Sequence, residues 1–238
     1  MNRIVKVGVA AFALAAVVPA LADETETPEA DEGVIGWTPV AVGLASPVQL
    51  PWGHAAWDVY GLDLGLLYYG APKMYGLGLA FGATYTTDTM AGADLSAFLN
   101  WHKGDVYGVS ATLGANISEG TTYGANLGGF AYRHDIWGLD LQFIGSFEDN
   151  MTGWQSAGIV NIAREQAYGV ESAIGVNIAH LAYGLQIAAI FNMADELHGC
   201  QVGLVNFAQE CPWGFQIGLV NIIMDNKLKV LPFFNAYF

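Results

Sequence analysis

The stretches Tyr183-Gly184-Leu185-Gln186-Ile187-Ala188 and Trp213-Gly214-Phe215-Gln216-Ile217-Gly218 share one pattern: aromatic, glycine, apolar, polar, apolar, small. The pattern starts at Tyr60-Gly61 and recurs every fourteen to sixteen residues along the chain. A period this regular indicates one structural element per repeat, and therefore an array of like elements. The eleven glycines that mark the repeats are Gly61, Gly76, Gly92, Gly108, Gly124, Gly138, Gly153, Gly169, Gly184, Gly199 and Gly214.

Apolar side chains alternate with polar or small ones inside each repeat. Tyr183, Leu185 and Ile187 share one parity, and Gln186 and Ala188 share the other. A period of two predicts β-strands with one apolar face and one polar face. The residue two places after each glycine is polar in ten repeats, and the residue four places after it is small in most. The ten polar residues are Asp63, Asp94, Ser110, Asn126, Asp140, Gln155, Glu171, Gln186, Gln201 and Gln216.

Two architectures satisfy this alternation. In a transmembrane β-barrel the apolar face meets lipid and the polar face lines a wet lumen. Strands of about 9–11 residues span a bilayer, which leaves roughly five residues of each repeat for a turn. In a β-solenoid each repeat is one coil, identical positions stack, and the apolar face forms the core.

Aromatic residues favour the barrel. They stand directly before many of the repeat glycines, on the apolar face. In a meander, alternate strands start at opposite rims, so this one position supplies both aromatic girdles of a membrane barrel. Inside a solenoid coil such side chains would be crowded. The predicted girdle residues are Tyr60, Tyr75, Tyr107, Tyr123, Trp137, Tyr168, Tyr183 and Trp213.

The predicted fold is therefore all-β: an antiparallel, up-and-down transmembrane β-barrel of about 12 strands formed by residues 57–238. Eleven strands come from the repeats and the last from about residue 229 onward. Phe234 and Phe238 share one parity of this last strand. They resemble the C-terminal signal by which bacterial outer-membrane barrels are recognised for assembly. The expected partners are accordingly outer-membrane lipid and, during biogenesis, the barrel-assembly machinery.

The residues before the repeats divide into three segments. Residues 1–22 have a basic start, an apolar run and a small-x-small site, which predict a signal peptide cleaved after Ala22. Residues 23–33 are acidic and predict a disordered spacer. Residues 34–56 lie outside the repeat and supply either an extra strand or a plug inside the lumen. These assignments predict an exported protein of the bacterial outer membrane.

The charge and the reactive residues narrow the function. A net charge of −14 makes nucleic acid a poor partner. The sequence contains no nucleophile elbow, phosphate loop or zinc signature, so we expect no enzymatic activity, no metal and no cofactor. Cys200 and Cys211 lie about a strand length apart, which favours free thiols over a local bend that would permit a disulfide.

Several stretches resemble an uncharacterised family of bacterial surface-repeat proteins. They are Pro47–Pro51 with Trp57–Gly65, the late repeats Gly199–Asn206 and Gly214–Asn221, and the ending Leu231–Phe238. The late repeats are similar to the family's GLQIGLVN signature. The resemblance spans most of residues 46–238 and implies an envelope location without an established activity.

Two functions remain open at the level of sequence. The leading hypothesis is a passive pore or a structural envelope barrel, with the polar face suited to cations or small neutral solutes. The alternative is a surface-exposed binding or adhesion repeat protein, either solenoid or barrel, with no transport role.

Overall fold

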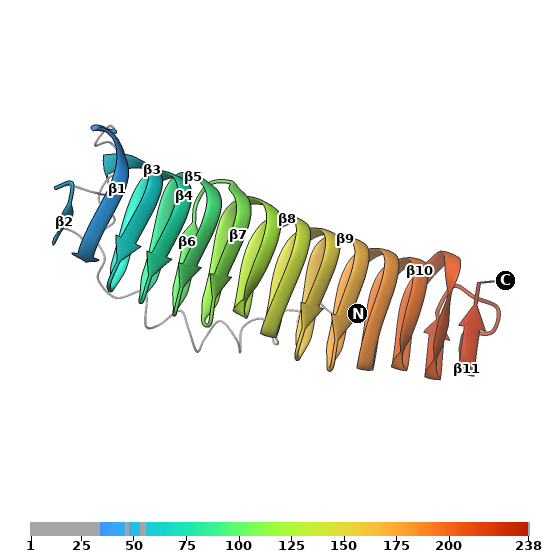
Figure 1. Cartoon of the computed structure of the whole chain (residues 1–238). Helices are drawn as coiled ribbons and strands as arrows, with labels where there is room; N and C mark the ends of the chain where they lie inside the picture. The colour runs from blue at the N-terminus through green and yellow to red at the C-terminus, as the bar shows by residue number, and fades with distance from the viewer. Residues whose placement is uncertain (1–33, 46–47, 53–55, 238) are drawn as a thin grey trace, which may run out of the picture. The chain divides into compact units, whose positions relative to one another are not determined.

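A computed structural model describes residues 34–45, 48–52 and 56–237. These residues form a parallel β-solenoid (Figure 1). The predicted antiparallel transmembrane barrel is therefore wrong, although the all-β class and the repeat are confirmed. The predicted signal peptide, the acidic spacer and Phe238 lie outside the described residues.

Eleven strands make up one continuous sheet in the described part of the chain, and their order follows the sequence with few exceptions. Strands β8 and β10 are long because they run through the bends of several coils. The bounds are β1 Gly36–Ala45, β2 Val48–Leu50, β3 Trp57–Gly65, β4 Tyr68–Ala80, β5 Ala83–Ser96, β6 Leu99–His102, β7 Val106–Thr112, β8 Ala115–Ala157, β9 Val160–Ala173, β10 Val176–Ile223 and β11 Val230–Ala236.

Each repeat is one coil, and equivalent positions of successive coils are hydrogen-bonded neighbours. Gly169 pairs in parallel with Gly153 on one side and with Gly184 on the other. In a parallel stack the equivalent strands of successive coils run in the same direction. A given repeat position therefore lies at the same distance from the bends in every coil. Parity of side chains is the same in parallel and antiparallel sheets, which is why the alternation did not reveal strand direction.

Each coil bends twice. The polar bend lies three to five residues before the repeat glycine, and the apolar bend lies five and six residues after it. In one coil, the segment Val176–Ala179 precedes the polar bend and the segment Leu181–Ala188 follows it, with a register shift between them. Equivalent segments of all coils form two facing layers, which we call the short layer and the long layer.

The repeat glycines permit the coils to approach closely. All eleven have positive φ, from +123° to +149°. A Cβ atom on Gly108 would lie 2.0 Å from the carbonyl oxygen of Gly92 in the coil below. The same close approach recurs between successive glycines, so this column requires residues without a side chain.

The described residues of segment 34–56 join the solenoid. Strand β1 stacks in parallel on β3, and β2 pairs with β1 in antiparallel orientation. The segment thus supplies strands, and the alternative prediction of a lumen plug fails with the barrel. At the other end, β11 pairs with β10 in antiparallel orientation. An antiparallel strand thereby covers each edge of the parallel stack.

Candidate binding surface

The ten polar residues predicted to line a lumen lie between the two layers. All ten are buried, with at most 3% of their surface exposed. The side chains face inward as the parity suggested. They do not line a channel, because they lie in a closed interior and most of them bond to other buried side chains or to backbone atoms. The prediction that these residues line a pore depended on the barrel fold, which the structure does not have.

An asparagine ladder fills the interior opposite these residues, and the sequence prediction missed it. Asn177 donates one amide hydrogen to Asn192 Oδ1 at 2.9 Å and another to the backbone oxygen of Ile187, in the long layer, at 2.8 Å. Asn192 and Asn206 repeat this arrangement. Each ladder step satisfies both hydrogens of a buried amide, so a polar core is stable here.

The small residues four places after the glycines make room for this ladder. A Cβ atom on Gly203 would lie 2.7 Å from Asn192 Nδ2, and one on Gly218 would lie 2.5 Å from Asn206 Nδ2. These small residues leave no open channel, because asparagine side chains from the short layer occupy the space beside them.

A second ladder ends on a buried carboxyl group. Gln216 donates to Gln201, Gln201 to Gln186, and Gln186 to Glu171, over distances of 2.7–2.8 Å. Burial raises the pKa of Glu171 to about 8, although the hydrogen bond from Gln186 acts in the opposite direction. Glu171 is thus mostly protonated at neutral pH.

We expect Glu171→Gln to remove part of the pH dependence of stability. The folded protein holds the Glu171 proton up to about pH 8, while the unfolded chain releases it near 4.5. The contribution of Glu171 is complete below pH 4.5, and the free energy of unfolding then falls by about 1.4 kcal/mol per pH unit as pH rises to 8. Urea unfolding at pH 5, 7 and 9 should show a shallower decline for the variant. Parallel pH profiles for the two proteins would contradict the assignment. Glu165→Gln, at an exposed position, should reproduce the wild-type profile.

A buried charged cluster replaces the ladders in the middle of the solenoid. Arg133 Nη2 lies 2.6 Å from Asp140 Oδ1, and Arg133 Nη1 lies 3.9 Å from Glu148 Oε1. The hydroxyl of Ser146 lies between the two carboxyl groups. Burial, followed by the neighbouring Asp140, raises the pKa of Glu148 well above its usual range. Arg133 is therefore paired with Asp140, and the raised pKa of Glu148 favours its neutral form.

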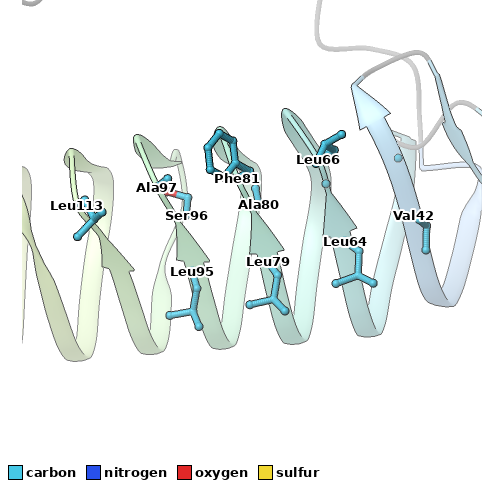
Figure 2. A pocket seen from close by; sticks show the side chains of 12 residues that line it. Val42, Leu64, Leu66, Leu79, Ala80, Phe81, Leu95, Ser96, Ala97 and Leu113 are labelled. Atoms are coloured by element: carbon cyan, nitrogen blue, oxygen red, sulfur yellow. The ribbon is translucent and has the colours of Figure 1, made fainter.

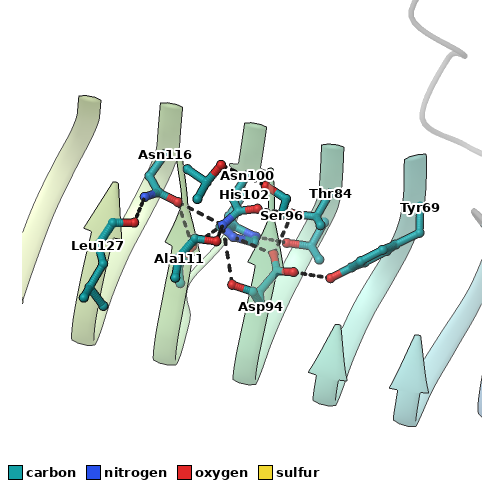
Figure 3. A network of polar contacts seen from close by, with 12 residues as sticks. Tyr69, Thr84, Asp94, Ser96, Asn100, His102, Ala111, Asn116 and Leu127 are labelled. Atoms are coloured by element: carbon teal, nitrogen blue, oxygen red, sulfur yellow. Dashed lines mark hydrogen bonds and ion pairs between the residues drawn. The ribbon is translucent and has the colours of Figure 1, made fainter. Parts of the chain in front are cut away.

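Another network of titratable side chains in the interior surrounds Asp94 (Figure 3). Asp94 accepts a hydrogen bond from Tyr69 and another from Thr84, the latter at 2.6 Å, and His102 Nε2 lies 3.2 Å from it. Tyrosine, aspartate and histidine could support acid–base chemistry in an open cleft. Here His102 is 2% exposed and Asp94 is fully buried, so no substrate reaches them. The network joins adjacent coils.

The residues predicted as membrane girdles form an aromatic row on the outer face of the long layer. Tyr168 and Tyr183 stack with ring centroids 4.7 Å apart. Because the coils are parallel, the row runs along one level instead of alternating between two rims. His198 continues it by stacking on Tyr183 at 4.2 Å and by an edge contact with Trp213. His198 stands directly before Gly199, the same repeat position as the aromatic residues, but the sequence prediction did not include it in the girdle.

The outer surface around the apolar bend is apolar in every coil between residues 57 and 224. Leu113 and Phe143 at this bend are each 77% exposed, and Ile174 is 70% exposed. An open groove of about 610 Å³ runs across several coils beside the bend (Figure 2). In Figure 2, Leu64, Leu79 and Leu95, which line the groove, lie along the strands below the bend. Apolar side chains on the outside make this surface a candidate binding site.

A second groove, of about 460 Å³, lies at the C-terminal end of the long layer. Phe234 lines it and packs against Phe215, with ring centroids 6.0 Å apart. Phe234 was predicted to be part of an assembly signal. The structure places it on β11, the strand that closes the stack.

Along residues 57–224, the exposed charges lie at the polar bend. Within residues 57–224, every Asp, Glu, Lys and Arg that is not buried lies three to five residues before a repeat glycine. Glu119, Arg164 and Glu210 are examples. The remaining charged side chains of this range are buried in the interior. One bend of the coil is therefore charged and the other is entirely apolar.

These features define the class of the protein: a parallel β-solenoid repeat protein with buried polar ladders in its interior and a largely apolar outer surface. No protein-family model matches the sequence, and no curated protein or solved structure matches it significantly. The resemblance to surface-repeat proteins thus stays a prediction.

Within the described residues, no helix is long and apolar enough to cross a membrane. Those residues also contain no cluster of metal-ligating side chains, and Cys200 and Cys211 are free thiols.

Proposed function

We propose that this protein is an exported bacterial envelope protein that binds a partner through the apolar outer surface of its solenoid, with no catalytic or transport role. The main support for this binding role is the apolar bend with its adjoining faces, where large side chains such as Leu113, Phe143 and Ile174 are mostly exposed. Soluble proteins rarely expose a continuous apolar surface of this extent unless it binds something.

The interior supports the same conclusion. Amide ladders and the cluster around Arg133 hold the fold together by hydrogen bonds. A buried apolar cluster that includes Ile136, Met151 and Leu197 adds to this core, and the large apolar side chains at the apolar bend lie outside it. Export is supported by the predicted signal peptide at residues 1–22.

Two measurements test this proposal. Mass spectrometry of the protein recovered from cells should show a mature chain that begins at Asp23. The folded protein should bind a hydrophobic dye while its far-UV circular dichroism keeps the β signature. An intact N-terminus on protein that stays in the cytoplasm would exclude the envelope role. Absence of dye binding would exclude the apolar binding surface.

A further inference from the structure

We infer that the apolar bend inserts edge-on into one leaflet of a lipid membrane, with the polar bend facing water. This inference rests on the proposed binding role and names the partner. The apolar bend comprises the residues five and six places after the repeat glycines. From coil to coil these include Leu66, Phe81, Phe98, Leu113, Phe143, Ile144, Ile159, Ile174 and Ile190, all more than half exposed.

The distribution of charge selects a membrane over a second copy of the chain. The outer faces of both layers are apolar close to this bend, for example at Val176 in the short layer and Ile187 in the long layer. A protein partner docked on one face would leave the other face and the bend in water. A lipid leaflet surrounds both faces and the bend at once.

The height of the long layer matches one leaflet. The aromatic row lies one residue before the glycine, and the apolar bend begins six residues later. At about 3.3 Å per residue this separation is about 20 Å. A bilayer with its headgroups is about 40–45 Å thick, so one leaflet is about 20 Å deep. Tyr168, Tyr183 and Trp213 would then lie at the headgroup level, where tyrosine and tryptophan are enriched.

Backbone polar groups at the apolar bend are paired, which permits entry into hydrocarbon. Bends are normally excluded from this region because their unpaired N–H and C=O groups lose water. Here Ala83 N donates to Leu67 O at 2.9 Å, and Val176 N donates to Ile159 O at 2.8 Å. Other coils show the same hydrogen bond between successive bends. The parallel stack supplies partners that an isolated turn lacks.

Flotation of the full chain with phosphatidylcholine vesicles tests the inference. We expect the wild-type protein to float with the vesicles, and to do so equally at high ionic strength, since apolar insertion is not screened by salt. Substitution of three exposed side chains at the bend, Leu113→Asn, Phe143→Asn and Ile174→Asn, should reduce the bound fraction at least about tenfold. Residues 1–33 are unchanged in the variant, so any difference between the two proteins arises at the bend.

A control variant carries three substitutions at the polar bend: Glu119→Gln, Glu165→Gln and Glu210→Gln. It should float like the wild type. Circular dichroism and the melting temperature should confirm that both variants fold, because all six positions are exposed. The inference is wrong if the wild type does not float or if the apolar-bend variant floats as well.

Analytical sedimentation without lipid tests the other possible partner of the apolar bend, a second copy of the chain. If the wild type does not float but self-associates through residues that the apolar-bend variant lacks, the partner is a second copy and the lipid inference fails. In that case the proposed binding role stands. If the hydrophobic dye also fails to bind, the proposed function fails with it.

Discussion

Replacement of Gly108 with alanine will destabilise the solenoid by at least about 3 kcal/mol. Gly108 has φ +131°, a conformation that residues with a Cβ atom rarely adopt. The new Cβ would lie 2.0 Å from the carbonyl oxygen of Gly92, which belongs to the backbone of the adjacent coil. Neither atom can move without separating two coils, so strain adds to steric repulsion.

Thermal and urea unfolding of the purified variant measure this effect. Gly36→Ala is the matched control, because Gly36 does not have positive φ and a Cβ there would meet the Trp57 ring at 3.0 Å. A side chain can shift where backbone cannot, so the control should lose far less stability. Equal losses in both variants would show that the glycine column is not a special constraint.

Replacement of Arg133 with methionine should cost about 3–5 kcal/mol, because it breaks the buried ion pair with Asp140 by removing one partner. Arg133 is 1% exposed and Asp140 is fully buried, so water does not compensate the loss. Urea unfolding at neutral pH measures the change. The double variant Arg133→Met with Asp140→Asn removes both charges and should be more stable than the single variant.

Glu148→Gln separates charge from packing in the same cluster. Since burial keeps Glu148 neutral, a neutral amide of similar shape should change stability by less than about 1 kcal/mol. A loss as large as that of Arg133→Met would instead mean that Glu148 is ionised and that Arg133 pairs with both carboxylates.

The repeat could be predicted from sequence, but its packing could not. The glycine period and the side-chain parity placed Gln186 and Tyr183 on opposite faces, as the structure does. The error was to assume that a polar face requires water and that a solenoid core must be apolar. Two ladders show another solution, in which equivalent amides of successive coils bond to each other.

A sequence signal for this solution existed. Asn177, Asn192, Asn206 and Asn221 recur in phase with the glycines, and identical amides at one level are typical of parallel, in-register stacks. The aromatic row has the same explanation: Tyr60 stacks on Tyr75 because the parallel, in-register pairing of β3 and β4 places the same repeat position side by side. The buried cluster around Arg133 could not have been predicted, because its partners come from coils in which the repeat is degenerate.

The close stacking of coils also determines how the number of repeats in such a protein can change by duplication of a unit. Most hydrogen bonds of a coil go to the coil before it or after it, so a duplicated unit of about fifteen residues could be added in the middle and find the same partners. Each added unit would lengthen the solenoid by about 4.8 Å. The contact area would therefore grow in proportion to the number of repeats, while the depth of the apolar edge would stay constant.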